Sequence, residues 1–324
     1  MPTAPRTLDA SLFGADHPRL LLVASTGGHL TQLVRLAARV SAAEDSLWVT
    51  FDSPQSRSLL AGKRVLWVDY VAPRDLAGTL RAYRAIARAA NPTDFDGALS
   101  SGAAVGLAGL SWAARHRIPR VYVESVSRTH GPSLTGRIIR GLRVAKTFTQ
   151  HEQWATPAWP AIPSVLGDFV RAEGADPAHP DAPLNILVTL GTIRPYRFDT
   201  LIDQVVSVLR PEDTVTWQLG ESRRTDLAGT THDLLPAEEL LAAARGADVV
   251  ITHAGVGTVL QLLENGVSPV VVPRRRVRGE HVDDHQLQIT SLLGTLDLAH
   301  PVEVEQLDRS TLASAARSRT RVAA

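Results

Sequence analysis

The residues best suited to hold a ligand form a short glycine turn, His253-Ala254-Gly255-Val256-Gly257-Thr258. The turn follows an apolar run at Val249–Ile251 that is typical of a buried parallel strand, and it leads into a helical pattern that ends near Asn265. Glycines let the backbone approach a phosphate closely, and the N–H groups at a helix start point at an anion. The pattern therefore predicts a phosphate site, with a plain helix-capping turn as the alternative.

A second buried strand, Val270–Val272, is followed by a polar loop that can fold over the same crevice. Its side chains are Glu280, His281, Asp283, Asp284, His285 and Gln286. His281 and His285 have the spacing of metal ligands on a helix, but they are expected in a loop. Asp94-Phe95-Asp96 has the spacing of a metal-binding motif but precedes a strand, whereas ligands collect beyond strand ends. We therefore predict no metal site.

Similar turns occur at other strand ends, which indicates repeated strand–turn–helix units. In the front half Ser25–His29 follows the apolar run Leu20–Ala24, and Ser100–Ala104 follows a short strand at Ala98-Leu99. In the rear half Thr189–Thr192 ends the strand that begins at Asn185.

The predicted fold is α/β, with two Rossmann-like domains of alternating strands and helices. Residues 1–166 form the front domain, residues 167–183 form a linker rich in Pro, Ala and Asp, and residues 184–324 form the rear domain. Doubly wound sheets collect ligands at the carboxyl ends of their strands. Two such halves are expected to face each other across one cleft.

Composition limits the possible functions. The chain has 324 residues and a net charge of +1, which argues against wholesale nucleic-acid binding. It contains no Cys, so disulfides, thiolate metal sites and a cysteine nucleophile are excluded. No apolar run approaches the roughly 20 residues that a spanning helix needs, and the first residues lack the apolar core of a signal peptide. We expect a soluble or peripheral protein.

The segment from Arg115 to Lys146 is strongly basic, with eight Arg or Lys residues against one acid, Glu124. Its pattern at 133–146 predicts an amphipathic helix with Arg137, Arg140, Arg143 and Lys146 on one side. Such a helix either packs on its own domain or lies on an anionic membrane surface. A second predicted helix, Asp75–Ala90, carries the basic stripe Arg81, Arg84 and Arg88 beside an apolar one.

These motifs together resemble glycosyltransferase family 28, the MurG-like enzymes with the GT-B fold. Ser25–Leu30 resembles the N-terminal turn of these enzymes, and Glu124-Ser125 with Ser133–Gly136 resembles the acceptor subunit of the two-part UDP-GlcNAc transferase of lipid-linked oligosaccharide and exopolysaccharide synthesis. Thr189–Thr192, His253–Thr258 and Gly279–Gln286 resemble the donor subunit. The chain resembles the two subunits fused.

The resemblance implies an inverting, metal-independent transfer of a sugar, GlcNAc or another hexose or uronic acid, from a UDP-sugar to a polyprenyl-diphosphate-linked saccharide in cell-surface polysaccharide synthesis. The implied donor residues are Gly191, Thr192, His253, Gly255, Gly257, Thr258, Gln261, Glu280, His285 and Gln286. The implied acceptor residues are Gly27, Gly28, Glu124, Ser125, Arg137 and Arg140, and His29 is the candidate base. An imidazole with the usual pKa near 6.5 suits that role, with helix capping or an acceptor-phosphate contact as alternatives. The enzyme would need no cofactor, bind no nucleic acid, and lie in the cytoplasm at the inner face of the membrane.

One position departs from the family, because Gln261 stands where a glutamate usually binds the ribose hydroxyls. This leaves three alternatives open: a soluble glycosyltransferase acting on a small natural product, a UDP-sugar 2-epimerase, and an inactive partner that only binds a nucleotide. The sequence does not identify the transferred sugar, the acceptor saccharide, the final polymer or the oligomeric state.

Overall fold

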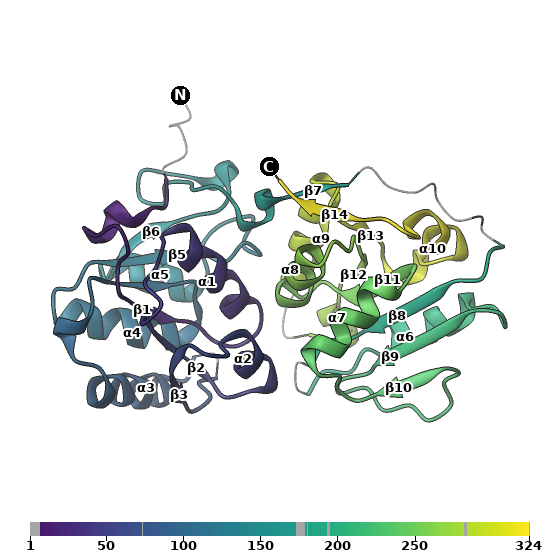
Figure 1. The fold of residues 1–324 in the computed structure, drawn as a ribbon, viewed down its shortest axis with the longest axis horizontal. Coiled ribbons are helices and arrows are strands. Elements are labelled where there is room, and N and C mark those ends of the chain that lie inside the picture. The colour runs from purple at the N-terminus through teal and green to yellow at the C-terminus, as the bar shows by residue number, and fades with distance from the viewer. Residues whose placement is uncertain are drawn as a thin grey trace. The chain divides into compact units, whose positions relative to one another are not determined.

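The chain divides into two compact units at Leu166 and Gly167, and each is described by itself. The computed structural model describes residues 7–72, 74–172, 179, 181–192, 195–281 and 284–323, and only the backbone of His285. Figure 1 shows a sheet surrounded by helices in each unit. The expected cleft between the domains stays a prediction.

The first unit is built on six parallel strands in the order β3-β2-β1-β4-β5-β6. The strands are β1 (Leu20–Val23), β2 (Leu47–Phe51), β3 (Arg64–Val68), β4 (Gly97–Ser100), β5 (Arg120–Val123) and β6 (Lys146–Phe148). The helices are α1 (Gly28–Arg39), α2 (Pro54–Leu59), α3 (Leu76–Ala89), α4 (Ala103–Arg115) and α5 (Leu134–Gly141). Strands β1 and β4 are buried along their whole length, because helices cover both faces of the sheet.

The second unit repeats this topology, with the strand order β10-β9-β8-β11-β12-β13. The strands are β8 (Asn185–Thr189), β9 (Thr214–Gln218), β10 (Thr230–His232), β11 (Val249–His253), β12 (Val270–Val272) and β13 (His300–Pro301). The helices are α6 (Asp199–Val208), α7 (Ala237–Gly246), α8 (Val256–Glu264), α9 (His285–Thr295) and α10 (Arg309–Ala315). The 3-10 turns of the chain are η1 (Ala10–Phe13), η2 (Pro92–Asp94), η3 (Glu152–Trp154), η4 (Val165–Asp168), η5 (Arg276–Arg278) and η6 (Val304–Gln306).

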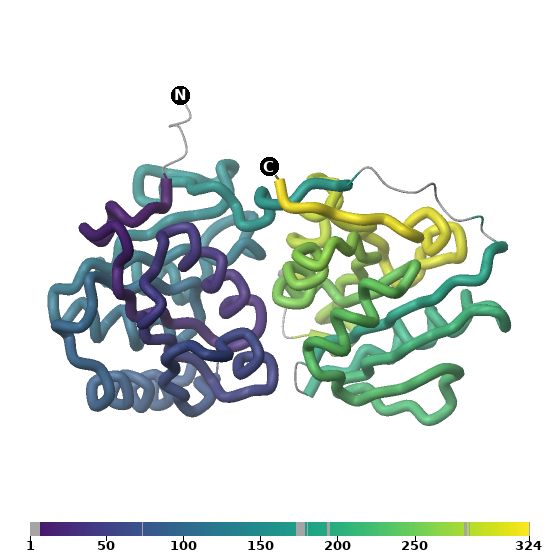
Figure 2. Tube along the Cα trace, viewed as in Figure 1, coloured from purple at the N-terminus to yellow at the C-terminus, as the bar shows by residue number. Residues whose placement is uncertain are grey.

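Two predicted boundaries are wrong. The helix expected over 133–146 ends at Gly141, because Arg143 adopts a left-handed φ of 54° and Lys146 already begins β6. Part of the linker expected at 167–183 is instead β7 (Phe169–Arg171), which pairs antiparallel with β14 (Thr320–Val322). Figure 2 shows this yellow terminal strand beside β7. Most of the remaining predicted linker lies outside the described residues.

The sheet order determines where a ligand can bind. In the first unit the strands that follow β1 are added first on one side of it (β2, β3) and then on the other (β4, β5, β6), so the turns after β1 and β4 flank a topological switch point. In the second unit the turns after β8 and β11 flank the equivalent point. Ligands of doubly wound sheets bind in the crevice at that point, beyond the carboxyl ends of the strands. The four predicted glycine turns are the four turns at these positions. No helix of the described residues is long and apolar enough to cross a membrane.

Candidate active site

The first switch point positions His29. The turn after β1 leads into α1, which has Gly27 as its N-cap, so His29 lies in the first turn of the helix. Its Nδ1 lies 2.9 Å from the carbonyl oxygen of Ser101, in the turn after β4, and the Ser101 hydroxyl donates to the His29 carbonyl at 2.6 Å. A Cβ at Gly102 would lie 2.6 Å from the imidazole Cε1. Two strand ends therefore hold this ring.

The hydrogen bond of His29 assigns its tautomer. A carbonyl oxygen only accepts, so the Nδ1 that faces Ser101 carries the proton. The lone pair of the neutral ring is then on Nε2, which is the atom able to take a proton from a hydroxyl. The role of His29 as a base stays a prediction.

Glu124 lies beyond the carboxyl end of β5, and its carboxylate is buried within the protein. One oxygen accepts from the Ser125 backbone N–H at 3.1 Å and from the Tyr122 hydroxyl, and the other accepts from the backbone N–H and hydroxyl of Ser133 at 2.9 and 3.0 Å. Burial raises the pKa of Glu124, and the hydrogen bonds from Ser133 and Ser125 oppose that rise. The predicted direct contact with an acceptor therefore gives way to a positioning role, because Glu124 fixes the start of α5.

Ser125 and Gly28 are joined by Gln32, a residue that the sequence analysis missed. Its side-chain nitrogen donates to the Gly28 carbonyl at 2.9 Å and to the Ser125 hydroxyl at 3.2 Å, and its oxygen accepts from the Val126 N–H at 2.8 Å. Gln32 is buried on α1 one turn after Gly28. A buried amide one turn after a glycine turn was the available signal.

The two arginines predicted to bind the acceptor lie three residues apart on α5 and make different contacts. Helix α5 starts at the carboxyl edge of the sheet and ends at its amino edge, where β6 begins. Arg137 lies near the helix start and donates to the Pro132 carbonyl at 3.2 Å. Arg140 lines a pocket with Arg120 and Lys146, at the starts of β5 and β6. Gly27 and Gly28 follow β1 at the carboxyl edge of the sheet, and the acceptor roles of Arg137 and Arg140 stay predictions.

At the second switch point a histidine ring is packed between two glycines. A Cβ on Gly191 would lie 2.4 Å from the His253 Cε1, and one on Gly255 would lie 2.2 Å from its Nε2. Gly191 also has a left-handed φ of 74°. These contacts explain why glycine occupies both positions. The His253 imidazole was predicted to contact the UDP-sugar donor. In the structure it packs between the turns that contain Gly191 and Gly255.

The His253 ring is held in its neutral form. Burial, followed by the nearby positive charge of Arg274, lowers the pKa of His253 to about 3. The unfolded chain, with a pKa near 6.5, binds a proton over pH 3–6.5 that the folded chain excludes. The stabilisation associated with this residue is therefore complete above pH 6.5 and is lost as pH falls toward 3.

A variant tests this linkage. We expect wild type and His253→Gln to differ most in unfolding free energy above pH 6.5, and the difference to shrink by up to about 1.4 kcal/mol per pH unit below it. Urea unfolding at several pH values measures the difference. His232→Gln, in a more exposed strand, is the matched control. A difference in unfolding free energy between wild type and the His253 variant that stays constant from pH 7 to pH 4 would contradict the lowered pKa of His253.

The start of α8 provides the predicted anion-binding amides. Gly255 is the N-cap of this nine-residue helix, and the first helical hydrogen bond runs from the Val259 N–H to the Gly255 carbonyl at 3.0 Å. The N–H groups of the first turn, which include those of Gly257 and Thr258, therefore have no carbonyl partner within the helix. Gln261 follows one turn later and is partly exposed, and Thr192 is exposed in the turn after β8.

Arg274 organises the loops around this helix start, and the sequence analysis did not single it out. The side chain is 1% exposed and lies two residues after the end of β12, beyond Pro273. Its guanidinium donates to the carbonyls of Leu190, Tyr196, Arg197 and Glu280 at 2.6–3.2 Å. It also lies 4.8 Å from the Phe198 ring. Burial lowers its pKa to about 10, so it remains charged at neutral pH. An arginine two residues after a buried strand was the signal.

The polar loop folds back on this arginine. The Gln286 side-chain oxygen accepts from the Arg274 backbone N–H at 2.9 Å, and the Glu280 carboxylate accepts from the Arg275 N–H at 2.9 Å and from the Thr200 hydroxyl. Glu280 and Gln286 therefore hold the loop in shape, whereas the prediction had them reaching the donor. His281 stacks on Tyr196 with ring centroids 5.9 Å apart.

The remaining loop predictions concern His285 and metal binding. Asp283 and the side chain of His285 lie outside the described residues. Within the described part of the chain, no group of three or more His, Asp or Glu side chains is arranged to hold a metal ion.

Comparison with known proteins identifies the second unit. Residues 185–323 match the family described as the glycosyltransferase family 28 C-terminal domain. The second unit matches this family over most of its length. The MurG-like resemblance of the sequence motifs is thereby confirmed, and Gly191, the start of α8 and Arg274 all lie inside this domain.

Curated relatives agree with this family. The chain is 30% identical over 175 residues to a UDP-N-acetylglucosamine–N-acetylmuramyl-(pentapeptide) pyrophosphoryl-undecaprenol N-acetylglucosamine transferase of Paraburkholderia xenovorans, covering 48% of this chain and 46% of the relative. It is 32% identical over 176 residues to the protein of the same name from Azoarcus, covering 47% and 48%. The alignments thus span about half the length of these relatives.

Solved structures share the fold over most of this chain. The glycosyltransferase of kitacinnamycin has a TM-score of 0.55 at 16% identity, covering 93% of this chain and 90% of that one. MurG of Acinetobacter baumannii has a TM-score of 0.51 at 20% identity, covering 91% and 88%. The predicted fold class is confirmed: two Rossmann-like α/β domains of the kind found in GT-B glycosyltransferases.

Proposed function

We propose that this protein transfers a sugar from a UDP-sugar to a hydroxyl of a lipid-diphosphate-linked saccharide, with inversion at the anomeric carbon. The observation that carries the proposal is the glycine-capped start of α8 at the switch point of a family 28 domain. The names of the curated relatives describe a UDP-N-acetylglucosamine donor and a pyrophosphoryl-undecaprenol acceptor. The lipid-linked saccharide is proposed to be used in the synthesis of a cell-surface polysaccharide.

The donor diphosphate is proposed to bind the first-turn amides of α8, with Thr258 adding its hydroxyl and Gly191 and Thr192 bordering the site. As the bond between the anomeric carbon and the diphosphate oxygen breaks, negative charge builds up on UDP. Preorganised N–H groups stabilise such charge without reorganisation. The proposed reaction uses no metal or other cofactor, because the helix start supplies this stabilisation. Gln261 is proposed to hydrogen-bond the ribose.

The acceptor is proposed to bind at the first switch point. Its hydroxyl oxygen attacks the anomeric carbon from the side opposite UDP, and its proton passes to Nε2 of His29. The hydrogen bond from Nδ1 to the Ser101 carbonyl keeps the ring in the required tautomer and orientation. The amides at the start of α1, which include Gly28, and the side chain of Arg137 are available to the acceptor diphosphate.

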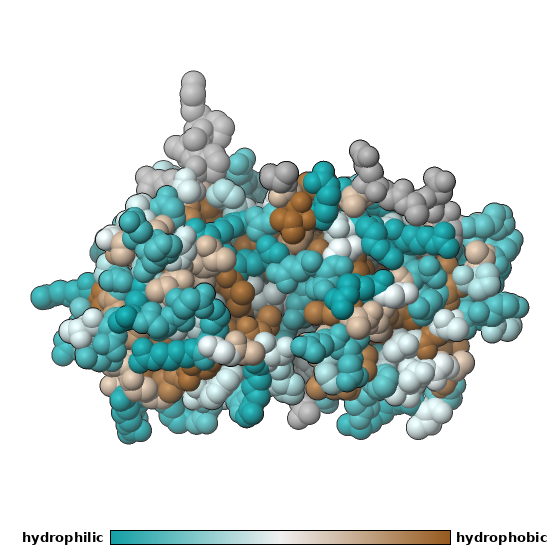
Figure 3. Space-filling model, in the orientation of Figure 1, coloured by the Kyte–Doolittle hydropathy of each residue, from teal (hydrophilic) through white to brown (hydrophobic). Residues whose placement is uncertain are grey.

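Helix α3 supports a peripheral position at the inner face of the cytoplasmic membrane. It buries Gly78, Ala82 and Ile86, which leaves Leu76 and Leu80 79% and 47% exposed. Leu76 and Leu80 of the apolar stripe read from the sequence are therefore not on the buried face, whereas Tyr83 of that stripe packs against the core. Arg81, Arg84 and Arg88 belong to the same helix, and exposed apolar side chains among cations are typical of membrane-surface helices. Figure 3 shows brown, hydrophobic side chains among teal ones on one face of the first unit.

Following UDP release over a panel of UDP-sugars tests the proposal. We expect release from one UDP-sugar only when a polyprenyl-diphosphate-linked saccharide is present, in detergent or vesicles. Release with a small soluble alcohol instead would favour the natural-product alternative. Conversion of the UDP-sugar without an acceptor would show a 2-epimerase, and UDP binding without turnover would show an inactive partner.

A further inference from the structure

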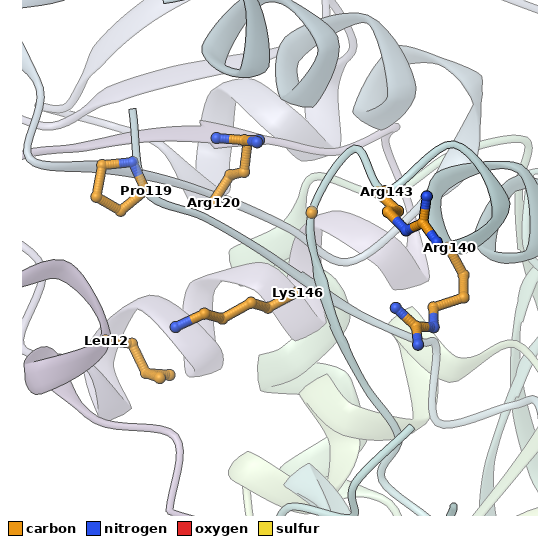
Figure 4. A pocket seen from close by; sticks show the side chains of 7 residues that line it. Leu12, Pro119, Arg120, Arg140, Arg143 and Lys146 are labelled. Atoms are coloured by element: carbon orange, nitrogen blue, oxygen red, sulfur yellow. The ribbon is translucent and has the colours of Figure 1, made fainter. Parts of the chain in front are cut away.

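The first unit has a pocket at the edge of its sheet opposite to the glycine turns. The pocket has a volume of about 500 Å³ and lies where β5 and β6 begin. Its charged lining is Arg120, Arg140, Arg143 and Lys146, and Leu12 of η1 borders it. Figure 4 shows Arg140 and Arg143 on one side of the pocket, while Lys146 extends toward Leu12. We call this the basic pocket.

The charge of the basic pocket is uncompensated. No carboxylate of the described residues lies within ion-pair distance of Arg140, Arg143 or Lys146, and all three side chains are exposed. Arg120 differs from these three residues, because its guanidinium donates hydrogen bonds to the backbone carbonyls of Ile118 and Val144. The nearby acid Asp9 caps η1 by accepting from the Ser11 N–H at 3.0 Å.

Cations before β1 and β3, at the same sheet edge, have acidic partners. Arg19, before β1, lies 2.6 Å from Asp45, and Lys63, before β3, pairs with Glu44. The β5–β6 end differs from these two strand starts, because Arg140, Arg143 and Lys146 have no such partner among the described residues. The C-terminus of α5 favours a cation in its last turn, which accounts for Arg140 but not for Lys146 on a strand. Clustered like charges repel one another, and a bound anion removes that cost.

We propose that the basic pocket binds a phosphate group and is a second anion site, separate from the transfer site. Two exposed guanidinium groups and one ammonium group match the oxygens of a phosphate or diphosphate. The pocket volume exceeds that of a single phosphate, which fits a diphosphate or a phosphorylated headgroup. The source of the phosphate is either a free phosphorylated compound or an anionic lipid, and the two are separated by experiment.

Inorganic pyrophosphate is the probe, titrated calorimetrically into the full-length protein with UDP at saturation to block the proposed donor site. We expect wild type to bind it and Arg140→Gln/Arg143→Gln to bind it at least about tenfold more weakly, a loss of about 1.4 kcal/mol. Arg84→Gln/Arg88→Gln, with the same charge change on α3, is the matched control and keeps wild-type affinity. Because the changed side chains are exposed, unfolding temperatures without pyrophosphate should match.

Co-flotation with phosphatidylglycerol vesicles, with phosphatidylcholine vesicles as the reference, identifies the source. Loss of both pyrophosphate binding and flotation in the Arg140/Arg143 variant assigns the pocket to an anionic lipid. Loss of pyrophosphate binding with flotation unchanged assigns it to a free phosphorylated compound. Pyrophosphate affinity equal in the variant and wild type overturns the proposal. UDP affinity, measured separately, reports on the proposed donor site and is expected to be the same in every variant.

Discussion

Replacing His29 with alanine is expected to lower the turnover number by roughly a hundred- to ten-thousandfold, the usual contribution of a general base. The imidazole is held between two strand ends, and its Nδ1 is 2.9 Å from the Ser101 carbonyl, which leaves Nε2 as the proton acceptor. Donor binding is proposed at the start of α8 in the other unit, so UDP affinity should stay unchanged. Initial rates at saturating UDP-sugar and acceptor, with calorimetric titration of UDP, measure the two effects.

His17→Ala is the matched control for this change. His17 is also in the first unit and its Nδ1 also faces a backbone carbonyl, that of Ser41 at 3.4 Å, but it is exposed and precedes β1 at the amino edge of the sheet. Its removal should leave turnover within about twofold of wild type, as is usual for exposed side chains. If His29→Ala lost UDP affinity while keeping its turnover number, the assignment of this residue as the base would be wrong.

Arg274→Met is expected to destabilise the second unit by about 3–5 kcal/mol and to abolish UDP binding. The substitution keeps much of the side-chain volume but removes the donors to four carbonyl oxygens, and each buried acceptor left unpaired costs about 1–3 kcal/mol before the loops relax. These carbonyls belong to the loops after β8 and β12. Without the arginine the loop after β8 loses its fixed position beside α8. Urea unfolding and calorimetric titration of UDP check both parts.

Two further variants separate stability from positioning. Arg276→Met removes an exposed neighbouring arginine and should change neither property. Arg274→Lys keeps the charge but cannot reach all four carbonyls from one ammonium group, so we expect it to fold while binding UDP at least about tenfold more weakly. If the lysine variant kept wild-type UDP affinity, the positive charge alone would be sufficient. The four hydrogen bonds from the guanidinium would then not be needed to position the UDP site.

Local patterns were sufficient to find the elements that carry the site. Apolar runs at Leu20–Ala24 and Val249–Ile251, each followed by a glycine turn and a helical period, are short-range signals, and strands and helices formed where these patterns indicated. The same signals located His29 and the start of α8. The resemblance to family 28 also rests on contiguous motifs, and the second unit confirms it.

Local patterns were insufficient where contacts join distant parts of the chain. The basic pattern continues past Gly141, so it did not indicate that α5 ends there. It also did not indicate that Arg140 lines a pocket with Arg120 and Lys146 at the starts of β5 and β6. Glu280 and Gln286 look like ligand contacts in a polar string, but their partners are Thr200 and the Arg274 backbone, which only folding brings to them. Arg274 itself looks like one of three equivalent arginines until burial singles it out.

By itself the sequence determined the fold class, the turns and the family, because hydrophobic period, glycine positions and motif strings are properties of neighbouring residues. Only the tertiary structure decided which turns share a switch point and which polar groups serve ligands or the protein itself. The contact between His29 and Ser101 spans 72 residues, and that between Arg274 and Leu190 spans 84. Such pairings are set by strand order and by the need to satisfy buried polar groups, and both depend on the whole fold.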